Sequence, residues 1–182
     1  TGLGITGLGD ALAMLGSQYG SESAIKWTEQ IYKSLAVNAY RSSIVMAKER
    51  GPFEVFDADK EDGHTFLKRI WDADPELEGM NKKYGRRNIA LTTTAPAGSV
   101  SVLTQTTSGI EPAFMLHYTR RKKLTGQDAA ARVDFIDDSG DQWQEYTVYH
   151  HGFKQWLDST DIDTEDLAAA VLNSPYAGAT AN

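Results

Sequence analysis

The stretch TTTAPAGSVS at residues 92–101, followed by TSGIEP at residues 107–112, has the pattern of a strand, a tight turn and a helix start. Pro96 fixes φ at the turn, and Gly98 removes the side chain where an anion would approach closely. The N–H groups of residues 97–100 are expected to be unpaired first-turn donors, with the positive end of the helix dipole behind them. Two serines add hydroxyl donors. The stretch indicates an anion site, and an ordinary capped helix start is the alternative that these residues alone leave open.

Two elements lead up to this stretch. Residues 21–50 have a helical pattern, with Ser21 as a favourable N-cap and Gly51-Pro52 as the stop signal. Small residues on one side of this helix predict close packing against a neighbour: Ala36, Ala39, Ser42, Ser43 and Ala47. Residues 89–93 predict a buried strand.

Shorter elements follow it. Residues 113–118 and 132–136 predict strands, and residues 141–157 predict a helix in which residues 146–149 leave a strand open. A final helix is expected at residues 164–172, with Thr164 as N-cap. The mixture predicts a helix-rich α/β fold.

Composition limits the classes of protein that the chain can represent. Its 182 residues fit one domain or a piece of a larger one, and its net charge of −7 argues against a nucleic-acid partner. No apolar run approaches the roughly 20 residues that span a bilayer, so no membrane association is expected. The chain has no cysteine, which excludes disulfides and thiol chemistry and fits a cytoplasmic location. Both ends resemble interrupted elements, so a fragment is expected.

Glycines at positions 2, 4 and 7 match the dinucleotide-binding fingerprint. That fingerprint needs a second strand after the helix, whereas a long helix follows here. We therefore interpret these glycines as a close strand-to-helix turn. The four histidines have no zinc-like spacing, and no metal site is expected.

Three charged features have structural interpretations. The basic run at residues 120–123 could steer a phosphate-bearing ligand, but a solvated strand end is the favoured interpretation. The acidic loop of Asp137, Asp138 and Asp141 is expected to face water or to cap the following helix. Glu111 is expected to accept backbone N–H bonds or to pair with an arginine.

Residues 88–101 and 107–112 resemble the large catalytic subunit of ribonucleotide reductase, and the similarity is strongest to its adenosylcobalamin-dependent class II. Further segments that resemble the family are residues 2–10, 38–43, 48–53 and 173–176. The resemblance implies that residues 1–182 form one partial domain, the C-terminal portion of a ten-stranded α/β barrel.

The same resemblance implies a function. The substrate, a ribonucleoside diphosphate or triphosphate, would bind through its diphosphate to residues Pro96, Ala97, Gly98, Ser99 and Val100. Ala97 stands where the family often has threonine, so one side-chain hydroxyl is missing. The full-length enzyme would use adenosylcobalamin to reduce ribonucleotides to deoxyribonucleotides.

The departures from the family decide what this chain can do alone. The family's radical chemistry needs cysteines, and the radical motif N-P-C-G-E is absent. No catalytic residue and no bound cofactor are therefore expected here, and the isolated chain is predicted to be inactive. A stand-alone nucleotide-binding module and an inactive structural remnant remain the alternatives. Exposed edges of an incomplete barrel favour homo-oligomerisation.

Overall fold

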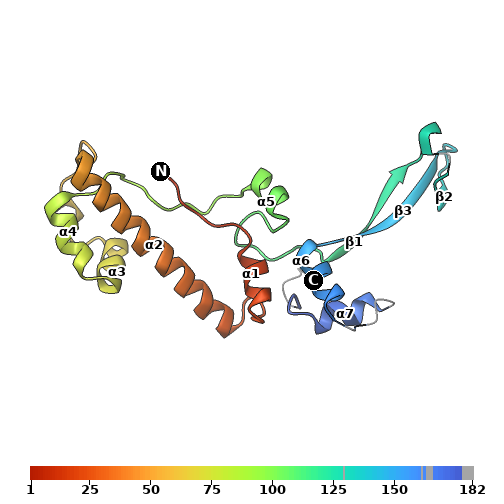
Figure 1. The fold of residues 1–182 in the computed structure, drawn as a ribbon, viewed down its shortest axis with the longest axis horizontal. Coiled ribbons are helices and arrows are strands. Elements are labelled where there is room, and N and C mark those ends of the chain that lie inside the picture. Colours follow the sequence, from red (N-terminus) through yellow and green to blue (C-terminus); the bar gives the residue numbers. More distant parts are fainter. Residues whose placement is uncertain (129, 161, 163–165, 178–182) are drawn as a thin grey trace.

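The computed structural model describes residues 1–128, 130–160, 162 and 166–177. Figure 1 shows a bundle of helices at one end of an elongated molecule and a long β-hairpin at the other, with short helices between them. In chain order the elements are α1 (Leu8–Met14), α2 (Glu22–Arg50), η1 (Asp59–Glu61), α3 (Thr65–Ala73), α4 (Glu76–Tyr84), α5 (Gly98–Thr104), β1 (His117–Lys123), η2 (Gly126–Asp128), β2 (Phe135–Ile136), β3 (Gln142–Tyr149), α6 (His151–Asp158) and α7 (Leu167–Asn173).

Helix α2 begins and ends where the sequence predicts. The Ser21 hydroxyl accepts the Ala24 N–H at 3.2 Å, and Gly51 follows the last turn with φ of 78°, which a residue with a side chain rarely adopts. Of the small residues on its packing side, Ala39, Ser43 and Ala47 are buried. The predicted close packing is confirmed, because α3 and α4 lie against α2 through a shared apolar core of Ala39, Tyr40, Ile44, Leu67, Ile70, Leu77 and Leu91.

The N-terminal segment runs parallel to residues 91–93. The Leu3 N–H donates to the Leu91 carbonyl at 2.8 Å, and the Thr93 N–H donates to the Leu3 carbonyl at 2.9 Å. A Cβ at Gly4 would overlap the Thr93 carbonyl oxygen, so this close approach requires glycine. The interpretation of these glycines as a close turn into a helix is confirmed, with Gly7 as the N-cap of α1 at φ of 72°, whereas the expected strand before the turn is reduced to the single bridge at Leu3.

The expected buried strand at residues 89–93 is largely wrong. A bend lies at Ile89, and the pairing of this segment is a single bridge between Leu3 and Thr92. Leu91 is buried, whereas Ile89 is 61% exposed. The apolar sequence pattern is that of a strand covered on both faces, and within the described residues one neighbour covers only part of it.

The β-hairpin corrects three predictions. β1 pairs antiparallel with β3 from His117 opposite Tyr149 to Lys123 opposite Trp143, and β2 adds only two residues to the other edge of β3. The strand expected at 113–118 therefore begins at His117, and the one expected at 132–136 is shorter. The helix expected at 141–157 is wrong up to residue 149, because the aromatic and β-branched residues of β3 favour the strand alternative.

A second apolar core holds the C-terminal helices. Its buried members come from α1, the segment before β1, α6, α7 and the residues after α7: Ala13, Ala113, Leu116, Phe153, Leu157, Ala170 and Tyr176. α7 begins after Asp166, whose carboxylate accepts the Ala169 N–H at 3.0 Å. The predicted N-cap Thr164 lies outside the described residues. The chain is helix-rich α/β as expected, and its described part is not a closed barrel.

None of the helices described has both the length and the apolar character needed to cross a bilayer.

One buried ion pair organises the helical end of the molecule. Arg86 Nη1 lies 2.5 Å from Glu61 Oε2, and Asn81 Nδ2 donates to the same oxygen at 3.3 Å. The guanidinium also lies 5.8, 5.4 and 5.9 Å from the ring centres of Tyr40, Phe53 and Phe56. Planar Arg over aromatic faces is favourable when water is excluded. The pair thus ties η1 to the segment that leads into residues 89–93.

We predict that Glu61→Gln lowers the free energy of unfolding by about 3 kcal/mol, because it leaves the Arg86 charge buried without a counter-ion. Chemical unfolding followed by circular dichroism measures this. Lys68→Ala is the matched control, because it removes the exposed pair with Asp72 and should cost less than about 0.5 kcal/mol. An effect of Glu61→Gln no larger than that of the control would contradict this role of the ion pair.

Candidate anion-binding turn and its support

The first turn of α5 carries the predicted anion donors. Ala97 is the N-cap residue, and Gly98, Ser99 and Val100 form the exposed first turn. Within the described part of the chain, the N–H groups of these three residues make no hydrogen bond. The Ala97 N–H differs, because it donates to the Ser108 carbonyl at 2.7 Å. The predicted donor set of residues 97–100 is corrected to residues 98–100.

The side chains of this turn provide fewer hydroxyl donors for an anion than the sequence suggested. The Ser101 hydroxyl donates to the Gly98 carbonyl at 2.8 Å, so its proton is engaged within the helix. Ala97 provides no side-chain cap. Ser99 remains as the exposed hydroxyl beside the three N–H groups. Pro96 precedes them in an exposed segment outside any helix or strand. The turn therefore depends on backbone donors for any anion.

A loop at residues 105–109 contacts both ends of α5. At the start of the helix, Ser108 accepts the Ala97 N–H as described. At its end, the Thr106 N–H donates to the Ser101 carbonyl at 3.2 Å, and the hydroxyls of Thr104 and Thr106 lie 2.8 Å apart. The short helix is thus held in place by this loop.

Glu111 binds the C-terminal end of the same loop. Its Oε1 accepts the Ser108 hydroxyl at 2.8 Å and the Gly109 N–H at 3.0 Å. Bonding to its own backbone N–H and to Ser108 holds the pKa of Glu111 below its usual value. The expectation that Glu111 accepts backbone N–H bonds is confirmed, and the arginine alternative is not what the structure shows.

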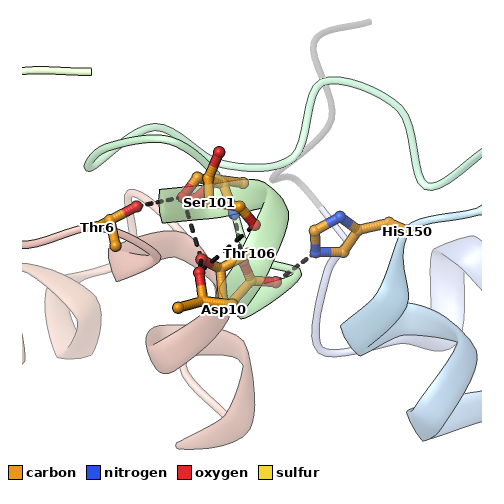
Figure 2. Close-up of polar contacts among 7 residues, drawn as sticks. Thr6, Asp10, Ser101, Thr106 and His150 are labelled. Atoms are coloured by element: carbon orange, nitrogen blue, oxygen red, sulfur yellow. Dashed lines mark hydrogen bonds and ion pairs between the residues drawn. The ribbon is translucent and has the colours of Figure 1, made fainter. Parts of the chain in front are cut away.

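Asp10 is the residue that sequence reasoning missed. It lies on α1, is 3% exposed, and accepts the Thr107 N–H at 3.0 Å through Oδ2. Its Oδ1 pairs with His150 Nε2. Figure 2 shows the His150 ring directed at Asp10, with a dashed line between the two side chains. Because an ionised carboxylate only accepts, His150 carries its proton on Nε2.

The electrostatics favour an ionised Asp10. Burial acts to raise the pKa of Asp10, but the bonds from His150 and the Thr107 N–H outweigh it and hold the pKa below its usual value. The Tyr176 side chain lies beside the same carboxylate. Burial and the Asp10 charge raise the pKa of Tyr176, so its hydroxyl stays protonated. Asp10 is therefore a buried anion surrounded by donors.

One sequence signal could have identified Asp10. It is a charged residue inside a short helix whose neighbours Leu8, Leu12 and Ala13 are apolar and buried. A carboxylate in such a setting must find donors elsewhere in the chain. The identity of those donors could not be predicted from the sequence, because Thr107 and His150 lie 97 and 140 positions away from Asp10.

The other charged candidates have structural roles. Three residues of the basic run pair with carboxylates on or near the hairpin: Arg121 with Glu145, Lys122 with Asp128, and Lys123 with Asp141. The solvated-strand interpretation is confirmed, although the run lies along β1 rather than at its end. In the acidic loop, Asp138 faces water, as one of the two expectations had it. Asp137 accepts the Ser139 and Asp141 N–H groups in the turn before β3, so the other expectation, a helix cap, is corrected to a hairpin turn. No group of three or more metal-ligating side chains occurs among the described residues.

Comparison with known proteins identifies the family. The profile described as "Ribonucleotide reductase, barrel domain" matches residues 1–177. The chain therefore belongs to the ribonucleotide reductase barrel-domain family, as its sequence indicated.

Relatives include enzymes with and without a B12 designation. One relative is the vitamin B12-dependent ribonucleoside-diphosphate reductase of Mycobacterium tuberculosis (strain ATCC 25618 / H37Rv). The two sequences are 32% identical over 119 residues, and the aligned part covers 65% of this chain and 14% of that protein. Another relative is the ribonucleoside-diphosphate reductase large subunit of Plasmodium falciparum (isolate Dd2). Here the identity is 24% over 184 residues, and the aligned part covers 93% of this chain and 23% of that protein. The chain thus spans less than a quarter of the length of these relatives.

We predict that Gly152→Ala destabilises the protein by about 1–3 kcal/mol, because the added methyl group would overlap the Tyr176 hydroxyl beside Asp10. Thermal or chemical unfolding provides the measurement. Gly79→Ala in α4 is the control, since a Cβ there meets nothing within 4 Å and should stabilise the helix by about 0.5–1 kcal/mol. Equal responses of the two variants would show that the contact at Gly152 is unimportant.

Proposed function

We propose that this chain is part of the catalytic barrel of a ribonucleotide reductase, an enzyme that reduces ribonucleotides to deoxyribonucleotides by radical chemistry. We assign residues 1–182 to one partial domain, the C-terminal portion of that barrel. Family membership and the names of the relatives support the proposal. They do not favour a stand-alone nucleotide-binding module or an inactive remnant.

Within this enzyme, we assign residues 96–100 to the diphosphate of a ribonucleoside diphosphate or triphosphate. The observation that carries this assignment is the exposed first turn of α5, whose three N–H groups from Gly98 to Val100 make no hydrogen bond to any residue that the structure describes and can bind phosphate oxygens. The first turn holds no acidic residue that would repel the anion. A Cβ at Gly98 would meet nothing within 4 Å, so the space above the turn is open to a ligand. Backbone donors and the helix dipole act together at such a site.

Adenosylcobalamin is the cofactor that we propose for the full-length enzyme, on the basis of the B12-dependent relative. When bound, it would supply the initial radical. This chain has no thiol to receive a radical, and its His150 Nε2 is engaged by Asp10. We therefore assign no residue of this chain to the cofactor.

Composition and the exposed apolar side chains support proposals about location and partners. We propose a cytoplasmic location, which fits the absence of cysteine, with neither nucleic acid nor membrane as a partner. Homo-oligomerisation stays a prediction, favoured by exposed apolar side chains at Val102, Leu103 and Phe114.

We predict that the chain binds a ribonucleoside diphosphate saturably, and that Gly98→Ala weakens the affinity roughly tenfold by placing a methyl group where the phosphate approaches. Gly98→Asp should abolish binding through charge repulsion. Isothermal titration with CDP and with inorganic pyrophosphate measures both effects.

Gly126→Asp is the matched control, because it adds the same charge at an open glycine on the hairpin and should leave the affinity unchanged. Unchanged binding by Gly98→Asp would contradict the assignment of the turn. Absence of binding by the unmodified chain at millimolar nucleotide would contradict the proposed site itself.

We further predict that the purified chain does not reduce ribonucleotides in the presence of adenosylcobalamin and a dithiol. The reason is chemical: without cysteine, no side chain of this chain can carry a thiyl radical or close a redox disulfide. Conversion of radiolabelled CDP or CTP to its deoxy product is the assay. Turnover that rises with protein concentration in a nuclease-treated, homogeneous sample would overturn the prediction.

A further inference from the structure

We infer that Asp10 is a positioning residue for the diphosphate-binding turn of α5, and that His150 holds the Asp10 carboxylate in place for this task. This inference rests on the proposed function, because it concerns the same turn. It adds two residues that lie outside residues 96–100 and that touch no part of the turn directly.

The first step is the contact between Asp10 and the supporting loop. Asp10 Oδ2 accepts the Thr107 N–H at 3.0 Å, and the neighbouring Thr6 hydroxyl donates to the Thr107 carbonyl at 2.6 Å. The backbone of Thr107 is therefore held at both its N–H and its C=O. Gly7, the N-cap residue of α1 with φ of 72°, packs directly against Thr106.

The second step leads from Thr107 to the phosphate donors. The next residue, Ser108, accepts the Ala97 N–H at 2.7 Å. Ala97 is the N-cap of α5 and directly precedes the free N–H groups of Gly98, Ser99 and Val100. A shift of Thr107 would move Ser108 and, through it, the start of the helix. Anion binding by backbone N–H groups depends on their common direction, so such a shift would weaken it.

The third step is the role of His150. It lies at the junction of β3 and α6, and its own N–H donates to the Leu116 carbonyl at 2.8 Å. Its ring is fixed from two sides, by the Asp10 carboxylate and by the Tyr176 ring at 5.7 Å. Asp10 can therefore accept from Thr107 and His150 at once, with one oxygen for each.

The arrangement also explains why Asp10 would not be replaced by a neutral core residue. An apolar side chain would leave the Thr107 N–H and the His150 ring without their acceptor, and unpaired buried donors are unfavourable. Asparagine differs, because its amide oxygen can still accept the Thr107 N–H and its amide group can still bond to the His150 ring.

The test compares Asp10→Ala, Asp10→Asn and His150→Ala in the full chain, with CDP and inorganic pyrophosphate as probes. Asp10→Ala is expected to weaken the affinity roughly tenfold, and His150→Ala somewhat less. Asp10→Asn should keep most of the affinity of the unmodified chain. Glu61→Gln is the control, because it destabilises the helical end of the molecule and should leave the affinity unchanged.

Amide hydrogen exchange separates positioning from general destabilisation. In Asp10→Ala, the Thr107 and Ala97 amides should exchange at least roughly tenfold faster, whereas the amides in the middle of α2 should keep their rates. In Glu61→Gln, the amides in the middle of α2 should exchange faster, whereas the Thr107 and Ala97 amides should keep their rates.

Each outcome decides one statement. If the unmodified chain binds CDP and Asp10→Ala binds equally well, this inference is overturned and the proposed function stands. If the unmodified chain binds neither probe, both are overturned. If Asp10→Ala loses affinity, and exchange in α2 accelerates as much as at Thr107, the residue is structural only and the inference fails. Loss of affinity with local exchange at Thr107 and Ala97, and recovery in Asp10→Asn, supports it.

Discussion

The fold of this chain depends on how one buried negative charge is satisfied. Asp10 is enclosed between α1, the 105–109 loop and the junction of β3 with α6, three regions that are far apart in sequence. A carboxylate removed from water is strongly unfavourable unless donors replace the lost hydration. Here a backbone N–H and an imidazole do so, and the Tyr176 hydroxyl lies beside them. The charge can be accommodated only when all three regions are assembled, so it favours this one arrangement over alternative packings.

Close backbone packing makes the assembly possible. Gly152 permits the Tyr176 hydroxyl to lie beside Asp10, and Gly9 permits the backbone of Glu111 and Pro112 to pack directly on α1. Both glycines occupy ordinary helical positions, where they weaken the helix relative to alanine. Their cost is offset by contacts that no larger residue allows. α1 consequently connects the helical end of the molecule, through Leu8, Leu12 and Ala24, to the C-terminal core around Phe153.

The parts that could be predicted from sequence are those set by local rules. The bounds of α2 follow from Ser21 and Gly51, and the turn into α5 follows from Pro96 and Gly98, because capping and φ preferences act over a few residues. The pairing of Asp10 with His150 could not be predicted, because it depends on which segments meet in space. The strand β3 was only an alternative to a helix, and only at residues 146–149, for a similar reason. Its aromatic and β-branched residues suit a strand, but only pairing with β1 decides against the helix.

The same distinction between local and long-range constraints bears on the proposed phosphate site. Its donors are backbone N–H groups, so the replacement of a family threonine by Ala97 removes one hydroxyl and leaves the N–H groups of Gly98, Ser99 and Val100 in place. What those groups need is a fixed direction, and α5 is too short to provide it alone. The direction comes from Ser108, which holds the Ala97 N–H, and from Asp10, which holds the residue before Ser108. A chain without any catalytic thiol can therefore keep a phosphate-binding turn, provided that a carboxylate remote in sequence stays buried, ionised and bonded.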